Sequence, residues 1–258
     1  MSQQTSTQSR IAIVTGGSRG IGRSTVESLA RRGVRVIFTY HSHREDASAV
    51  IASAKQLGTE AFALPLDTSK TADFKAFADS VRGVLMQLGE ERFDYLVNNA
   101  GNNHHNMPLE SVTEEEMDSI YNVHFKGVLF LTQELLPLIN DGGRIVNVST
   151  TRTRLSSRGG AAYASMKGAI EVLSRHMATE LGPRRITVNV VAPGAVATDF
   201  SGGIVRDNPE VNKMVASHTA LGRVAGAEDI GPAIASLLSN ENGWVNGQRI
   251  EVNGGVMM

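Results

Sequence analysis

Tyr163 and Lys167 are the two residues of this chain whose types and spacing point most directly to chemistry. They stand four residues apart in Tyr163-Ala-Ser-Met-Lys167, so on a helix both side chains lie on one face. A free phenol loses its proton only near pH ~10. An ammonium group beside it favours the phenolate and would make the pair an acid–base group usable near neutral pH. A surface tyrosine beside a lysine stem has the same spacing, so the rest of the chain must decide.

The composition suits one globular domain with a substantial core. The chain has 258 residues, 41% of them hydrophobic and 20% charged, with a net charge of −1. The absence of a basic run gives no support for a nucleic-acid partner, and no apolar stretch approaches the ~20 residues of a membrane span. The absence of cysteine excludes disulfides, thiolate catalysis and Cys-ligated metal. We therefore expect a cytoplasmic protein without a metal site.

Two polar segments are interpreted as solvated chain. Residues 1–9 are rich in Ser, Thr and Gln and lack the apolar core of a signal peptide, so we expect a flexible tail before a domain spanning 10–258. His104 and His105 lie in a polar stretch, which favours a solvated loop over a metal site.

Strand and helix patterns alternate along the chain. Near-continuous apolar runs predict strands buried on both faces of a parallel sheet. They are Ile11–Thr15, Val34–Tyr40, Ala61–Leu66, Tyr95–Asn98, Arg144–Ser149, Thr187–Val191 and Gln248–Val252. Helices are predicted at Gly20–Arg32, Arg44–Leu57, Thr71–Leu88, Glu114–Leu138, Ala161–Leu181 and Glu228–Leu238. This alternation indicates βαβ units and a doubly wound α/β fold in one domain.

One irregular segment, residues 199–221, interrupts this alternation. It is rich in Gly, Asn and polar residues and follows the sixth predicted strand. Ligands of open α/β sheets bind beyond the carboxyl ends of the strands. We therefore predict a substrate lid here, with the amphipathic piece Ile204–Ala216 between flexible glycines.

A glycine cluster follows the first predicted strand. Thr15-Gly16-Gly17-Ser18-Arg19-Gly20-Ile21-Gly22 leads directly into a predicted helix. Glycines let the backbone approach a pyrophosphate, and a helix N-terminus offers N–H donors to it. A tight turn without a ligand is the alternative interpretation.

The motifs together resemble the short-chain dehydrogenase/reductase family. They are T-G-x-x-x-G-I-G at 15–22, N-N-A-G at 98–101, Y-x-x-x-K at 163–167, Pro193-Gly194, and the ending Val252-Asn253-Gly254-Gly255. The resemblance extends over almost the whole chain. Within the family, the overall pattern of motifs is similar to that of the 3-oxoacyl-carrier-protein reductases. It implies a single Rossmann-like domain with seven parallel strands in the order 3-2-1-4-5-6-7, helices on both faces, a nicotinamide dinucleotide, and a homotetramer or homodimer.

The resemblance also implies roles for single residues. Gly16, Gly20 and Gly22 would line the phosphates, Asp67 would bind the adenine, and the Pro193–Thr198 stretch would hold the nicotinamide. Asn98 would support the central strand, and Asp67 has helix capping as an alternative role. The full expected cofactor set is Gly16, Ser18, Arg19, Gly20, Ile21, Gly22, Tyr40, His41, Ser42, Asp67, Thr68, Asn99, Ala100, Gly101, Tyr163, Lys167, Pro193, Gly194, Val196 and Thr198.

Charge near the second strand predicts which dinucleotide is used. NAD-binding proteins commonly place an acid at the end of this strand. Here the stretch from Phe38 to Arg44 contains no acid, and Arg19 lies in the glycine loop. A 2′-phosphate would meet no repulsion there, so NADP(H) is expected.

Two catalytic positions differ from the family pattern. The family has a serine thirteen residues before the tyrosine, where this chain has Thr150. A threonine hydroxyl can donate the same hydrogen bond to a substrate oxygen. Ser149 is adjacent, but strand alternation would point it to the other side.

The second difference is at His124, which occupies the slot of the family's helical asparagine. The asparagine positions a water next to the lysine. His124 could position this water through its backbone carbonyl or through its ring. If the ring takes part, protonation of the histidine would also affect the reaction. A packed helix histidine without a catalytic role is the third interpretation.

These observations predict an NADP(H)-dependent oxidoreductase acting on a small carbonyl or alcohol substrate, of ketone or 3-oxoacyl type. Tyr163 would be the general acid/base, assisted by Lys167, Thr150 and His124. Two alternatives stay open, an epimerase or dehydratase on the same scaffold and a dinucleotide sensor with little turnover. Residues after Gly101 and the 199–221 segment would line the substrate pocket.

Overall fold

The computed structural model describes residues 10–102 and 107–256. Residues 1–9, His104 and His105 lie outside the described residues. Among those described, seven strands form one parallel sheet in the order β3-β2-β1-β4-β5-β6-β7, which confirms the predicted topology. The strands are β1 (Ile11–Val14), β2 (Arg35–Tyr40), β3 (Ala61–Pro65), β4 (Phe93–Asn98), β5 (Ile139–Val148), β6 (Thr187–Pro193) and β7 (Arg249–Val252).

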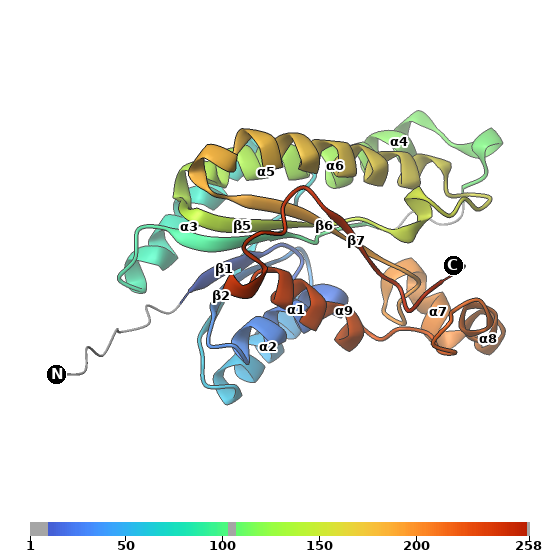
Figure 1. Ribbon diagram of the computed structural model, residues 1–258, viewed down its shortest axis with the longest axis horizontal. Helices are drawn as coiled ribbons and strands as arrows, with labels where there is room; N and C mark the ends of the chain where they lie inside the picture. Colours follow the sequence, from blue (N-terminus) through green and yellow to red (C-terminus); the bar gives the residue numbers. More distant parts are fainter. Residues whose placement is uncertain (1–9, 103–106, 257–258) are drawn as a thin grey trace.

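Helices cover both faces of the sheet, as predicted. Figure 1 shows α3, α5 and α6 over one face and α1, α2 and α9 over the other. The helices are α1 (Gly20–Ala30), α2 (Arg44–Gln56), α3 (Phe74–Gln87), α4 (Glu114–Tyr121), α5 (Gly127–Leu135), α6 (Ala161–Glu180), α7 (Ile204–Asp207), α8 (Pro209–Ser217) and α9 (Ala227–Leu237).

Strand β1 shows how the sequence builds the two layers. Successive side chains of a strand point to opposite faces. Ile11 and Ile13 accordingly belong to the core beneath α3, α5 and α6, whereas Ala12 and Val14 belong to the core beneath α1, α2 and α9. All four are fully buried, which explains why the strand has no polar alternation.

The predicted long helix Glu114–Leu138 is interrupted. Between α4 and α5 the chain forms a π-helical turn, Asn122–Lys126. At its end Gly127 packs against the segment after β3, where an added Cβ would lie 2.2 Å from the Thr68 carbonyl oxygen. The hydrophobic period alone did not reveal this widened turn, because it inserts one residue without removing apolar positions.

The 199–221 segment contains two short helices where one amphipathic piece was expected. Helices α7 and α8 are separated at Asn208, whose side chain accepts hydrogen bonds from the backbone N–H groups of Glu210 and Val211. Pro209 follows and has no N–H to continue the preceding helix. Figure 1 shows both helices beyond the end of the sheet, near the C-terminus.

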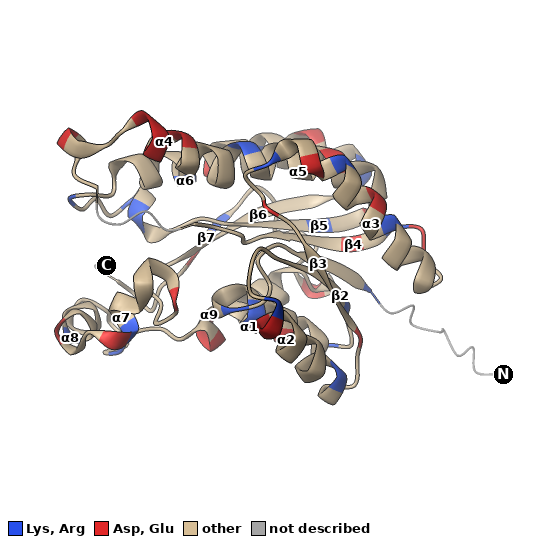
Figure 2. Ribbon diagram, turned by 180° about the vertical axis from the view of Figure 1, so that it is seen from behind, with Lys and Arg blue, Asp and Glu red and all other residues tan. Residues whose placement is uncertain are grey.

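The charged residues are spread over the helices. Figure 2 shows basic and acidic residues interspersed along the helices of both faces. Within residues 10–102 and 107–256, no helix is long and apolar enough to cross a membrane. In the same ranges, no group of three or more acidic, histidine or cysteine side chains lies close enough to hold a metal ion.

Candidate active site

The candidate catalytic residues come from three elements beside the carboxyl ends of β4, β5 and β6. Tyr163 and Lys167 lie on the first turns of α6. Thr150 follows β5 directly and precedes a short 3₁₀ turn, Thr151–Thr153. His124 lies in the π-helical turn.

Tyr163 and Lys167 lie on the same side of α6, as their spacing predicts. The Lys167 ammonium nitrogen is 5.8 Å from the centre of the Tyr163 ring. It also donates a 2.8 Å hydrogen bond to the Val148 carbonyl at the end of β5. The lysine is buried, with 5% of its surface exposed, so its charge is presented to the site and not to solvent.

Burial shifts the pKa values of both residues toward their neutral forms. Removal from water raises the pKa of Tyr163, and the opposing effect of the Arg152 charge is weaker. Removal from water lowers the pKa of Lys167 to about 8. The expectation of a Tyr163 pKa near neutrality is therefore not met in this structure, because desolvation dominates the shift. At neutral pH Tyr163 is a phenol, which is the form that donates a proton.

His124 is packed against Tyr163. Its side chain is 1% exposed, and its ring meets the Tyr163 ring edge-on, with centroids 5.1 Å apart. Its Nε2 atom lies 3.1 Å from the Asn102 carbonyl oxygen. Because a carbonyl only accepts, Nε2 carries the proton in this contact, and in the neutral ring Nδ1 is the acceptor. The ring therefore lies between Tyr163 and the segment after β4.

The two neighbouring hydroxyls after β5 have different partners. Ser149 donates a 2.7 Å hydrogen bond to Glu171, on α6. The Thr150 hydroxyl accepts a 3.3 Å bond from the Arg152 N–H, which leaves its own proton available for another acceptor. This division follows the expected strand alternation and favours Thr150 over Ser149 as the donor to a substrate.

The glycine loop between β1 and α1 is shaped for close backbone approach. Gly16 has φ +64°, a conformation that side chains disfavour. An added Cβ at Gly22 would lie 2.0 Å from the Gly16 carbonyl oxygen, so α1 begins against the loop only because Gly22 has no side chain. Ser18 is buried, and the exposed Arg19 directly precedes α1. Ile21 packs against the core beneath α1 and α2.

Thr15 connects this loop to the segment after β4. Its hydroxyl accepts hydrogen bonds from the N–H groups of Asn99 and Ala100, at 2.9 and 3.0 Å. The Asn99 amide donates to the Thr15 and Gly16 carbonyls. Asn98 points into the sheet, where it donates to Asn147 on β5. The N-N-A-G motif thus holds the start of the glycine loop through hydrogen bonds to Thr15 and Gly16.

The expected adenosine end lies at β2 and β3. The Asp67 carboxylate accepts two hydrogen bonds from Ser69, before the 3₁₀ turn that begins at Thr71. The alternative that Asp67 caps this helical turn is wrong, because the hydrogen bonds close a separate turn. Burial alone would raise the Asp67 pKa, but the Ser69 bonds and the nearby His41 and Lys70 lower it. Tyr40 is half-buried, and His41 and Ser42 are exposed.

The expected nicotinamide end follows β6. Pro193 is the last residue of β6, and an added Cβ at Gly194 would lie 3.2 Å from the Asn253 side chain. Val196 bridges to Ala225. The Thr198 methyl faces the glycine loop, 3.5 Å from the position of a Cβ on Gly20. The candidate cofactor residues therefore line one edge of the sheet from β2 to β6.

Sequence reasoning missed several residues at this edge. The ring of Phe200, in the 199–221 segment, lies 6.2 Å from the Tyr163 ring. Glu171 and Arg249 form an ion pair beside the segment after β5. The sequence contains two features that could have pointed to this pair. Arg249 and Glu251 are two residues apart, so they share one face of the last strand. Glu171 stands four residues after Lys167, so it shares a helix face with the lysine.

Comparison with known proteins agrees with these motifs. A family model described as enoyl-(acyl carrier protein) reductase matches residues 16–257. The 3-oxoacyl-[acyl-carrier-protein] reductase of Staphylococcus aureus is 34% identical over 249 residues, which cover 96% of this chain and 98% of the relative.

Two solved structures are similar over nearly their full lengths. The reductase LugOII, described as catalysing keto-reduction at C1 during lugdunomycin biosynthesis, has a TM-score of 0.91 and 36% identity, covering 96% of this chain and 98% of its own. The angucycline C-6 ketoreductase LanV with bound NADP has a TM-score of 0.90 and 35% identity, covering 96% and 95%. The chain is a member of the short-chain dehydrogenase/reductase family of oxidoreductases.

Proposed function

We propose that this protein is an NADP(H)-dependent carbonyl reductase that converts a ketone or 3-oxoacyl-type substrate to the alcohol. The proposal rests above all on Tyr163, whose phenol lies beside Lys167 and His124 at the sheet edge. The similar proteins LugOII and LanV are named for keto-reduction, which supports the same reaction class here.

In this proposal the residues of the chain handle the proton. Tyr163 donates its phenolic proton to the carbonyl oxygen, and Thr150 donates a hydrogen bond to the same oxygen. Lys167 stabilises the phenolate that remains, because its ammonium lies beside the ring. The chemistry that bound NADPH supplies is a hydride to the carbonyl carbon, so hydride and proton together give the alcohol.

We assign the parts of the dinucleotide to residues along the carboxyl edge of the sheet. The Gly16–Gly22 loop and the start of α1 would hold the pyrophosphate, because the loop has no Cβ at its closest approach. Asp67 and Thr68 would hold the adenine side, and Arg19, Tyr40, His41 and Ser42 the 2′-phosphate side. Asn99, Ala100, Gly101, Pro193, Gly194, Val196 and Thr198 would border the ribose and nicotinamide.

A panel of ketones with NADPH tests the function. We expect loss of NADPH absorbance in step with alcohol formation. Tyr163→Phe removes only the transferable proton and should lower kcat by ~10²–10⁴-fold, while NADPH binding measured by fluorescence stays within ~threefold. Substrate conversion without net NADPH loss would indicate an epimerase or dehydratase. Tight NADPH binding without turnover on any ketone would favour a dinucleotide sensor.

We also propose that the protein works as a homotetramer or homodimer in the cytoplasm. Phe130 on α5 and Val172 on α6 are 42% and 47% exposed, and Trp244 is 99% exposed. Exposed apolar side chains mark a surface that another subunit covers where they form a contiguous patch, and these three are the candidates for such a contact. Light scattering would measure the mass, and a monomer at assay concentration would contradict the proposal.

A further inference from the structure

An ion pair between Glu171 and Arg249 lies beneath the segment that carries Thr150. The Arg249 Nε atom is 2.7 Å from Glu171 Oε1, and the two side chains are only 8% and 12% exposed. Glu171 belongs to α6 and Arg249 to β7, so the pair joins the helix of Tyr163 to the last strand of the sheet. The proton-transfer steps proposed above do not use either residue.

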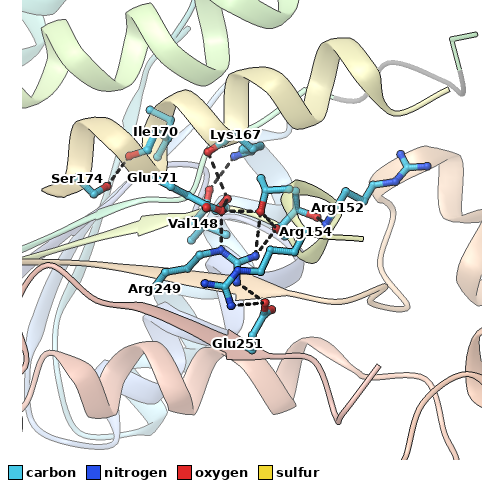
Figure 3. Close-up of polar contacts among 12 residues, drawn as sticks. Val148, Arg152, Arg154, Lys167, Ile170, Glu171, Ser174, Arg249 and Glu251 are labelled. Atoms are coloured by element: carbon cyan, nitrogen blue, oxygen red, sulfur yellow. Dashed lines mark hydrogen bonds and ion pairs between the residues drawn. The ribbon is translucent and has the colours of Figure 1, made fainter. Parts of the chain in front are cut away.

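The pair holds the segment 149–153 by several hydrogen bonds, shown as dashed lines in Figure 3. Arg249 donates to the Thr150 carbonyl at 3.0 Å and to the Thr153 hydroxyl at 2.9 Å. Glu171 accepts from the Ser149 hydroxyl at 2.7 Å and from the Thr153 hydroxyl at 2.8 Å. Both ends of the short segment are therefore fixed to the same two charged side chains.

These contacts continue directly into the catalytic lysine. Lys167 holds the carbonyl of Val148, Glu171 holds the hydroxyl of Ser149, and Arg249 holds the carbonyl of Thr150. Three consecutive residues, Val148 at the end of β5 and the two that follow it, are thus each bonded to a charged side chain that is largely shielded from solvent. Lys167 and Glu171 stand one helical turn apart, so α6 presents Tyr163 and the two anchors along one face.

The chemistry of Arg249 suits a positioning role better than a purely stabilising one. A buried ion pair costs desolvation that apolar residues of similar volume avoid, so it is weak evidence for stability. Its guanidinium reaches Glu171 through Nε, Thr150 through Nη2 and Glu251 through Nη1. A planar fork with fixed donors makes all three contacts at once, whereas a lysine ammonium does not.

We propose that Glu171 and Arg249 are positioning residues that set where the Thr150 hydroxyl stands relative to Tyr163. Arg249 acts through the Thr150 carbonyl, and Glu171 acts through the hydroxyls of Ser149 and Thr153. This inference rests on the proposed reductase function for its kinetic consequence, but the placement of the segment is measurable without turnover.

Amide hydrogen exchange tests the placement. Arg249→Lys keeps the charge and loses the fork, and Glu171→Gln keeps the shape and loses the charge. Each should increase exchange about tenfold or more in peptides covering 150–155, where the Arg152 and Arg154 amides bond to Thr150 and Thr151. Thermal unfolding of each variant shows that it is folded. Unchanged exchange in both folded variants would overturn the proposal.

Arg184→Lys is the matched control. Arg184 also bridges an acid and two backbone carbonyls, those of Leu136 and Ile139, near the opposite end of β5. Its replacement should increase exchange around residues 136–141 and leave both the 150–155 peptides and kcat unchanged. Equal loosening of 150–155 in this control would show a general loss of stability and would overturn a specific role.

A double-mutant cycle tests the kinetic consequence. Arg249→Lys should lower kcat for ketone reduction on the order of tenfold, because small displacements of catalytic groups are costly. In a Thr150→Ala background, the same replacement should cost less than ~twofold, because no hydroxyl remains to position. Equal losses in both backgrounds would overturn action through Thr150. If the unaltered protein reduces no ketone, the function proposal fails, and the exchange measurement alone decides the placement.

Discussion

The rings of His124 and Tyr163 meet edge to face, with their planes at 88° and their centroids 5.1 Å apart. This geometry is the favoured one for aromatic pairs, and it brings a titratable ring against the proposed proton donor. Because Nε2 of His124 bonds to the Asn102 carbonyl, the histidine also connects the phenol to the segment after β4. The side chain at position 124 therefore contacts the proposed proton donor directly.

Replacing His124 should affect catalysis through this ring contact. His124→Ala leaves a space beside Tyr163 and should lower kcat about tenfold. His124→Asn restores the residue type implied by the family resemblance and should stay within about threefold of the unaltered protein. Steady-state reduction of one ketone at saturating NADPH measures both variants. Full activity in His124→Ala would mean that only the backbone at this position matters.

The pH dependence of reduction should report Lys167. Its pKa is lowered to about 8, and the Tyr163 pKa is raised, so only the lysine loses its proton between pH 7 and 9. Raising the pH through 8 removes the charge that stabilises the phenolate, so kcat/KM for NADPH should fall above about pH 8. This parameter refers to the free enzyme.

Lys167→Arg is the control for this limb. A guanidinium stays charged at all these pH values. The Lys167→Arg variant should therefore reduce ketones more slowly, but its kcat/KM for NADPH should no longer fall near pH 8. A flat profile to pH 10 in the unaltered protein would contradict the assignment to Lys167.

Cofactor preference should follow the charge at the end of β2. The unaltered protein should have a much higher kcat/KM with NADPH than with NADH. Tyr40→Asp should erode this preference, because a carboxylate there repels a 2′-phosphate and suits free ribose hydroxyls. Gln87→Asp, which adds the same charge near the exposed end of α3, should leave the ratio unchanged. Equal kcat/KM values for the two cofactors in the unaltered protein would refute the prediction.

The 199–221 segment should become ordered over the bound dinucleotide. Phe200 already lies near Tyr163, and Arg206 pairs with Asp199 across the 3₁₀ turn. Hydrogen exchange in peptides covering 199–221 should slow several-fold when NADP is added, with α3 peptides as the internal reference. The same exchange with and without NADP would argue against a lid.

The sequence predicted the fold well because the fold depends on local patterns. The apolar runs of β1 to β7 and the glycine loop identify the sheet, its edge and the proposed cofactor side without knowledge of distant contacts. The π-helical turn and the break at Asn208 were not predicted from the sequence. Each depends on backbone packing or capping, which hydrophobic periodicity does not reveal.

The candidate site was predicted less completely than the fold. Tyr163 and Lys167 share a helix face, as one helical turn requires. The direction of the Tyr163 pKa was wrong, because it depends on burial, which spacing does not reveal. The Glu171–Arg249 pair joins residues 78 positions apart, so only the tertiary fold brings them together.

The widened turn between α4 and α5 makes the number of residues there as important as their identity. Each α-helical residue advances the chain by roughly 100° around the axis. The widened turn Asn122–Lys126 holds one extra residue within a single turn, so α4 and α5 face nearly the same way as in one regular helix. Deleting one residue from 122–126 would let the turn close with little rotation of α4 relative to α5, so Ile120 would keep its core position near Ala162. The ring contact between His124 and Tyr163 depends on the widened turn and would be lost, so a single codon loss here would damage the site and spare the fold.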